Sequence, residues 1–70
     1  MAALTSDQIE LLRRARDGLA PWGGSVRLDR LQAEIELLEA MLLIEPDDMA
    51  PYRLTLTGSL VLDAVSRPAS

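Results

Sequence analysis

Carboxylates, serines and arginines are the side chains of this 70-residue chain that could support chemistry, because the sequence contains neither His nor Cys. Without these two residue types, a Ser-His-Asp triad, a thiol nucleophile and the common zinc sites are excluded. Glu34, Glu36 and Glu39 lie close enough in sequence for paired acid–base carboxylates. We interpret them as the solvated flank of a helix, because carboxylates at this spacing are typical of one.

The remaining chemical motifs are incomplete. Ser25, Ser59 and Ser66 have no evident base beside them in the sequence. The pair Asp47-Asp48 lacks the ligand count and the glycine of a calcium loop. The pair Gly23-Gly24 lacks the surrounding pattern of a phosphate-binding loop. We therefore expect no enzyme, no catalytic residues, no metal site and no cofactor.

The net charge of this chain gives it little attraction for nucleic acid. The chain has 11 acidic and 7 basic residues, for a net charge of −4, and every basic residue is Arg. An acidic protein has no overall attraction for a phosphate backbone, although local basic patches can exist. Arg13, Arg14 and Arg16 form one such cluster. We interpret it as a solvated face that complements a helix dipole, with a nucleic-acid or partner contact as the alternative.

The first element that must position these residues is a helix ending near Asp17. Thr5 and Gln8 have the spacing of a capping box, and Leu4 and Ile9 occupy the positions of a hydrophobic staple. Gly18 fits a left-handed C-cap. The face predicted to be buried is Ile9, Leu12, Ala15 and Leu19.

A joint follows this helix. Pro21-Trp22-Gly23-Gly24 predicts a turn, and we place Trp22 in the small core, with a functional Trp as the alternative. Residues 25–28 alternate, which predicts a short strand with Val26 and Leu28 inward or, alternatively, a helix that starts at Ser25. If the segment is a strand, Asp29 caps the next helix and Gln32 closes a second capping box.

The longest periodic segment is residues 28–44, which predicts the central helix. Its core stripe is Leu28, Leu31, Ile35, Leu38 and Leu42. Leu37 and Met41 form a second apolar stripe on nearly the opposite side. Arg30 and Glu34 make an i,i+4 pair that stabilises a helix by about 0.2–0.5 kcal/mol. In such a helix one apolar side packs into the core, and the other side is covered by another part of the chain or by a partner.

The rest of the chain predicts a hairpin and a closing helix. Residues 43–45 and 52–55 are predicted as strands joined by a loop of about six residues. Thr55 or Thr57 caps a last helix that Pro68 stops, with residues 67–70 as a tail. The predicted apolar positions of that helix are Leu56, Leu60, Val61, Ala64 and Val65. The expected fold class is mostly α with a small β-hairpin (α+β): one domain over residues 1–70, with about three helices and a two- to three-stranded sheet.

The second half of the chain resembles the winged-helix domain of bacterial regulators, in a truncated form. The resemblance rests on Leu38-Glu39, Leu43-Ile44, Tyr52-Arg53-Leu54-Thr55 and Gly58. It implies a wing at the hairpin, transcription regulation, and DNA contacts by Arg27, Arg30 and Arg53. Two departures are visible. One helix, rather than two, fits between the first strand and the wing, and the outward face of residues 28–44 lacks the amides and bases that read a major groove.

These observations favour a protein surface over a DNA surface. Exposed apolar stripes mark interfaces, so we predict a protein interface at Leu37, Met41, Arg30 and Glu34. The alternative is that the first or the last helix covers the Leu37/Met41 stripe within the monomer. We expect a small regulatory module of the kind borne by phages or mobile elements, acting as a homodimer or on a protein partner; the alternative is a DNA-binding winged-helix regulator. The start of the chain lacks a signal-peptide pattern and no apolar run reaches roughly 18 residues. We therefore expect a cytoplasmic protein without a membrane span.

Overall fold

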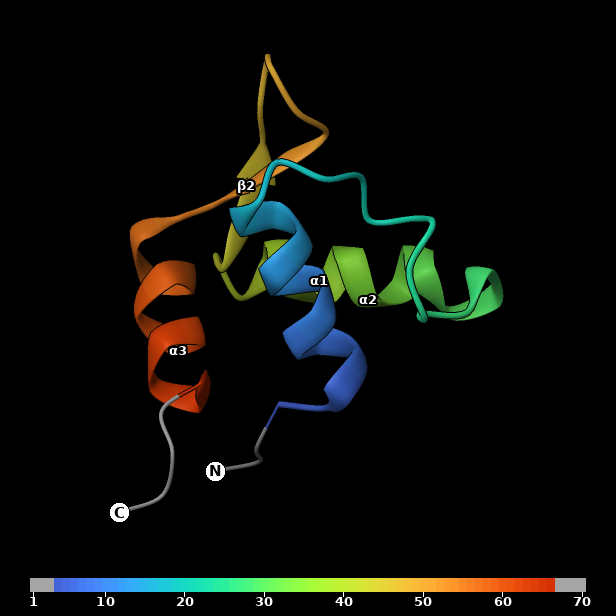
Figure 1. The fold of residues 1–70 in the computed structure, drawn as a ribbon, viewed down its shortest axis with the longest axis horizontal. Coiled ribbons are helices and arrows are strands. Elements are labelled where there is room, and N and C mark those ends of the chain that lie inside the picture. The colour runs from blue at the N-terminus through green and yellow to red at the C-terminus, as the bar shows by residue number, and fades with distance from the viewer. Residues whose placement is uncertain (1–3, 67–70) are drawn as a thin grey trace.

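The computed structural model describes residues 4–66, and these form three helices and one antiparallel hairpin (Figure 1). The order is α1 (Ser6–Arg16), α2 (Leu28–Ala40), β1 (Ile44–Pro46), β2 (Tyr52–Leu54) and α3 (Leu56–Ser66). The predicted α+β fold class is confirmed, with two strands in the sheet. The predicted tail at residues 67–70 lies outside the described residues.

Helix α1 begins and ends as its sequence predicts. The Thr5 hydroxyl accepts from the Gln8 amide N–H, and the Thr5 amide N–H donates to the Gln8 side chain, which completes the capping box. Gly18 has φ +73°, and the amides of Gly18 and Leu19 donate to carbonyls of the last turn, as in a Schellman cap. The buried face was predicted wrongly at one position. Leu11 is buried, whereas Leu19 is exposed because the chain turns away at Gly18.

The joint between α1 and α2 contains no strand. Val26 is buried as predicted, but Leu28 is exposed, and residues 25–28 pair with neither β1 nor β2. Helix α2 begins at Leu28, so the predicted start at Ser25 is also wrong. Its N-cap is Arg27 without a side-chain cap bond. Asp29 is inside the first turn, where its carboxylate faces the Arg27 guanidinium at 3.2 Å instead of capping the helix.

Helix α2 ends earlier than residue 44. Leu42 has φ +61°, and the Leu42 and Leu43 amides donate to the carbonyls of Glu39 and Leu38. This is a Schellman cap with leucine in a left-handed conformation, which costs a non-glycine residue about 1–2 kcal/mol. The cap turns Leu43 and Ile44 into the core and leaves Leu42 exposed. Leu42 was predicted in the core stripe, and only Leu31, Ile35 and Leu38 of that stripe are buried.

The hairpin connects α2 to α3, and one residue, Thr55, bonds the two helix ends together. Ile44 pairs with Leu54 and Pro46 with Tyr52, which leaves a loop over residues 47–51. Thr55 then caps α3, because its hydroxyl accepts from the Gly58 amide at 2.9 Å. The same hydroxyl donates to the Leu42 carbonyl, and the Thr55 amide donates to the Leu43 carbonyl at 3.1 Å. The end of α2 and the start of α3 are therefore held together by Thr55.

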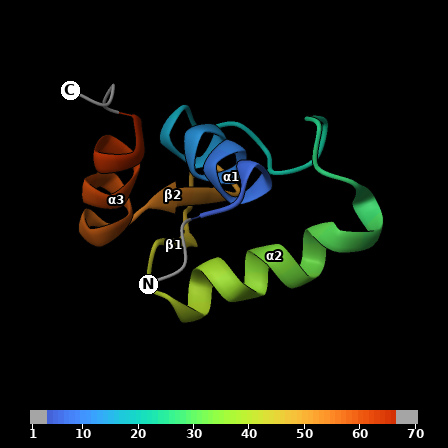
Figure 2. The same ribbon diagram turned by 90° about the horizontal axis from the view of Figure 1, so that it is seen from below.

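The core contains apolar residues of all five elements or the segments beside them. Its buried members are Leu11, Leu12, Ala15, Val26, Leu31, Ile35, Leu38, Leu43, Ile44 and Leu62. Helix α3 contributes Leu62 and the buried Gly58, with Val61 partly buried. Leu56, Leu60, Ala64 and Val65, which were predicted as apolar positions of this helix, are exposed. In both views α3 stands at one edge of the molecule and the start of α2 at the far edge (Figures 1 and 2).

Gly58 is where α3 approaches the backbone before β1. A Cβ at this position would collide with the Leu43 carbonyl. Gly58→Ala should therefore lower the free energy of unfolding by about 1–3 kcal/mol through overpacking, measured by urea denaturation. Ser59→Ala, at the exposed neighbouring position, is the control and should change stability by no more than about 0.5 kcal/mol. Equal stability of the two variants would contradict the close approach.

Candidate protein-interaction surface

The predicted interface residues lie along one flank of α2 and its C-cap, beside the buried stripe of Leu31, Ile35 and Leu38. Leu37 and Met41 are both 44% exposed and one turn apart. The Arg30 guanidinium lies 3.7 Å from the Glu34 carboxylate; the Arg30 side chain is largely exposed, whereas the Glu34 side chain is mostly buried. The structure thus brings these four residues onto neighbouring turns of one helix and exposes its apolar pair.

Three further leucines are exposed around the junction of α2 and α3. Leu42 is 69% exposed, Leu56 79% and Leu60 64%. Leu42 is next to Met41 in the chain and is bonded through its carbonyl to Thr55, Leu56 follows Thr55, and Leu60 lies one turn further along α3. We call Leu37, Met41, Leu42, Leu56 and Leu60 the junction surface. The sequence-based prediction missed its last three members, because it placed Leu42 in the core stripe and gave Leu56 and Leu60 only as apolar positions of the last helix.

The arginines predicted to contact DNA are each paired with a carboxylate of the same chain. Arg27 lies 3.2 Å from Asp29, and Arg30 pairs with Glu34. On the hairpin, Arg53 donates to Glu45 at 2.6 Å, and this bond raises the pKa of the Arg53 guanidinium. These pairs neutralise the charges that would meet phosphates, so the described surface around them has no uncompensated basic patch.

Part of the Arg13–Arg16 cluster bonds to the segment between α1 and α2. The Arg14 guanidinium donates to the carbonyl of Ala20 at 2.6 Å and to that of Trp22 at 2.9 Å. Arg16 pairs with Asp17 at 3.0 Å. These bonds fix the backbone of the turn while the Trp22 side chain is 56% exposed. The prediction that Trp22 fills the core is wrong, and Pro21 is the buried residue of this turn.

Glu10 holds the other end of the same turn. Its carboxylate accepts from the Ser25 hydroxyl at 2.6 Å and from the Ser25 amide at 2.7 Å. A Cβ on Gly24 would meet this carboxylate, so a larger residue there would push the Glu10 side chain aside. Ser25 therefore does have a carboxylate beside it, contrary to the sequence-based prediction. The hydrogen bonds to Ser25 lower the pKa of Glu10, which makes it a poor proton acceptor, and we assign the pair to fixing the turn.

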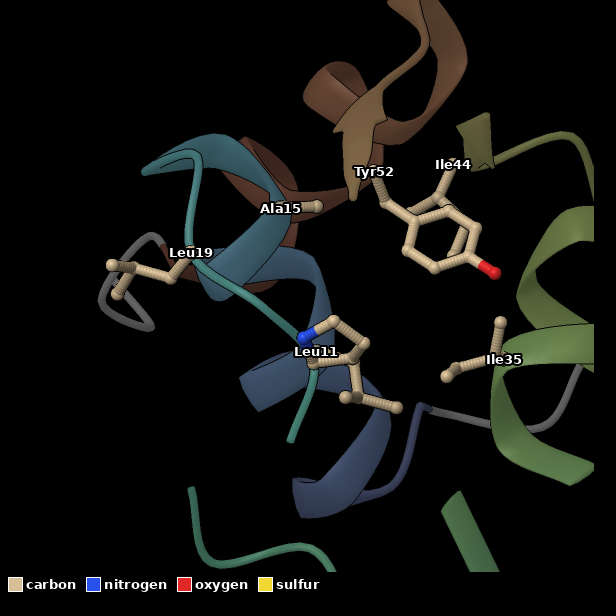
Figure 3. Close-up of a pocket in the computed structure, with 7 residues that line it drawn as sticks. Leu11, Ala15, Leu19, Ile35, Ile44 and Tyr52 are labelled. Atoms are coloured by element: carbon tan, nitrogen blue, oxygen red, sulfur yellow. The ribbon is translucent and has the colours of Figure 1, made fainter. Parts of the chain in front are cut away.

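A small cavity lies between α1, α2 and the hairpin (Figure 3). Its volume is about 10 Å³, and its lining includes Leu11, Ile35 and Tyr52. Figure 3 shows the Tyr52 ring between Ile44 and Ile35, and Leu19 pointing away from the other labelled side chains. Burial raises the pKa of the Tyr52 phenol, with a further contribution from Glu39. The cavity is far smaller than the roughly 300–1,000 Å³ of ligand pockets, so we attribute it to imperfect packing.

Residues 4–66 contain no group of three or more acidic side chains placed to hold a metal ion, and no helix among them is long and apolar enough to cross a membrane. No protein-family model, no curated protein and no solved structure matches this chain. The resemblance to winged-helix regulators therefore remains a prediction from the sequence.

The Glu10–Ser25 contact predicts a pH dependence of stability. Because the folded pKa of Glu10 lies below its ordinary value of 4.5, the contact stabilises the fold above that pH and is lost as the pH falls through the folded pKa. The difference in unfolding free energy between wild type and Glu10→Gln should therefore shrink from about pH 6 to about pH 3, measured by urea denaturation. In a Ser25→Ala background this change should become smaller, because the bond from the hydroxyl is lost while the bond from the backbone amide of residue 25 remains. A difference that stays constant with pH would contradict the role of Glu10.

Proposed function

We propose that this chain is a small non-enzymatic regulatory module that acts through protein–protein contacts, as a homodimer or with another protein. The observation that supports it is the distribution of apolar residues. Ten large apolar side chains of the described residues are exposed, as many as the ten apolar residues in the buried core. Scattered exposed apolar residues are normal, but five of these form the junction surface, and clusters of this kind mark interfaces.

The size of the chain supports the same proposal. A domain of about 60 residues buries only about 60% of the surface that its unfolded chain exposes, and its stability is marginal. This sequence has no Cys to form disulfides and no His to help bind a structural metal. Covering the junction surface with a partner would add apolar burial that the monomer lacks, at about 25 cal/mol per Å².

DNA binding is the alternative function, and one observation bears on it: an antiparallel hairpin follows α2 directly, as a wing follows a recognition helix. Against it stand the net charge of −4 and the pairing of Arg27, Arg30 and Arg53 with carboxylates. A DNA-binding protein should shift a DNA duplex at low salt and lose affinity steeply as salt rises. Absence of a shift on the promoter of the neighbouring operon at low salt would count against this alternative.

The proposal predicts the effect of charges on the junction surface. Leu37→Glu with Met41→Glu should weaken binding to a second copy or another partner by at least about tenfold, because carboxylates at an apolar interface lose hydration. Sedimentation velocity measures self-association, and recovery with the tagged protein from its native host measures other partners.

The matched control is Leu28→Glu with Gln32→Glu. It adds the same two carboxylates at the same i,i+4 spacing to exposed positions on another flank of α2, so it should leave association unchanged. Circular dichroism should show both variants folded. A wild-type protein that is monomeric at high concentration, together with a Leu37/Met41 variant that retains every partner, would contradict the proposed function.

A further inference from the structure

Helix α3 is held to the rest of the molecule by little buried apolar surface. Its two buried residues are Gly58 and Leu62, and glycine has no side chain, so Leu62 is the one side chain that α3 buries fully. Val61 is partly buried against the core. By comparison, α1 and α2 each bury three apolar side chains fully. Elements with few buried apolar contacts are the ones that open at the lowest free energy.

Polar bonds at one residue fix the start of α3. The Thr55 hydroxyl donates to the Leu42 carbonyl and accepts from the Gly58 amide. The Thr55 amide donates to the Leu43 carbonyl. Thr55 is also the single residue between the end of β2 and the start of α3. Hinges consist of a few residues at the ends of elements, so a backbone rotation at Thr55 breaks these bonds and moves α3 away from the core.

We propose that α3 is a lid, which opens at Thr55 while α1, α2 and the hairpin stay folded, and that the Thr55 hydroxyl is its latch. Opening uncovers the Leu43 carbonyl, which Gly58 approaches closely, and the parts of α1 and β2 against which α3 packs. Figure 2 shows α3 beside α1 at the edge of the molecule. The inference concerns the monomer alone and does not rest on the proposed function.

Such a lid regulates access to the surface beneath it. A partner that binds only the open form has an apparent affinity reduced by the fraction of molecules that are open. The strength of the latch therefore sets that affinity, although the latch itself is no part of the surface that the partner contacts.

Amide hydrogen exchange tests whether α3 opens separately. An isolated helix as short as α3, with 11 residues, is marginal in water, so its amides exchange once it leaves the core. Measured by NMR under conditions where closing is faster than exchange, the amides of Val61 and Leu62 should have protection factors at least about tenfold lower than those of Leu12 and Leu38. Equal protection of α3 and the core would overturn the proposal.

A mild core substitution separates the opening of α3 from the unfolding of the whole chain. Ile35→Val removes one carbon from a buried side chain of α2. It should speed exchange at Leu12 and Leu38 about two- to tenfold, because their amides exchange through whole-chain unfolding. It should leave exchange at Leu62 unchanged, because α2 stays folded when α3 opens. An equal acceleration at Leu62 would mean that α3 opens only together with the rest, against the proposal.

The latch is tested at position 55. Valine has the shape of threonine without the hydroxyl, so Thr55→Val should speed exchange of the α3 amides at least about tenfold, because it removes the bond to Leu42 and the cap at Gly58. The matched control is Thr57→Val, the same change at an exposed position in the first turn of α3. The control should change exchange by no more than about twofold. Equal effects of the two substitutions would show that the Thr55 hydroxyl is not the latch.

Discussion

The contact between the start of α3 and the backbone before β1 is the constraint on which the rest of this small structure depends. Thr55 is bonded to the carbonyls of Leu42 and Leu43 and also caps α3. Gly58 permits the approach because a Cβ there would meet the Leu43 carbonyl. Leu42 must be left-handed, with φ +61°, for these carbonyls to point at Thr55. Together these features set which face of α3 meets the core, and they leave the opposite face exposed.

The local signals in the sequence predicted the elements well because they act over a few residues. The Thr5/Gln8 capping box, the left-handed Gly18, the hairpin and the Thr55 cap are all present. The predictions failed where a distant contact decides. The orientation of α3 cannot be read from its pattern, because leucines and valines occur on all its sides and Gly58 marks the core face only once its approach to Leu43 is known.

The exposed Trp22 shows the same limitation. A lone Trp in a small apolar chain is most simply placed in the core, but the turn is fixed from outside by Arg14 and Glu10, which bond its backbone. Charged side chains of α1 thus do what a buried aromatic residue was expected to do. Of the candidate site, the second apolar side at Leu37 and Met41 was predictable from helical spacing, but its exposure was not, because the first or the last helix could have covered it. The exposure of the leucines beside them was not predictable, because Leu42 becomes exposed through the α2 cap and the contact at Gly58 decides which apolar residues of α3 face outward.

The charges on the surface also limit which partners each exposed face can bind. Arg27, Arg30 and Arg53 are each paired with a carboxylate of the same chain, so these three contribute little net positive charge toward a phosphate backbone or an acidic protein. An acidic chain of this kind approaches another copy of itself against a net repulsion. That repulsion is smallest where the surface has the fewest charges, and the burial gain is largest where it has the most leucine. On α3, Leu56 and Leu60 are exposed and Asp63 is the sole charged residue, so this helix combines exposed apolar side chains with few charges.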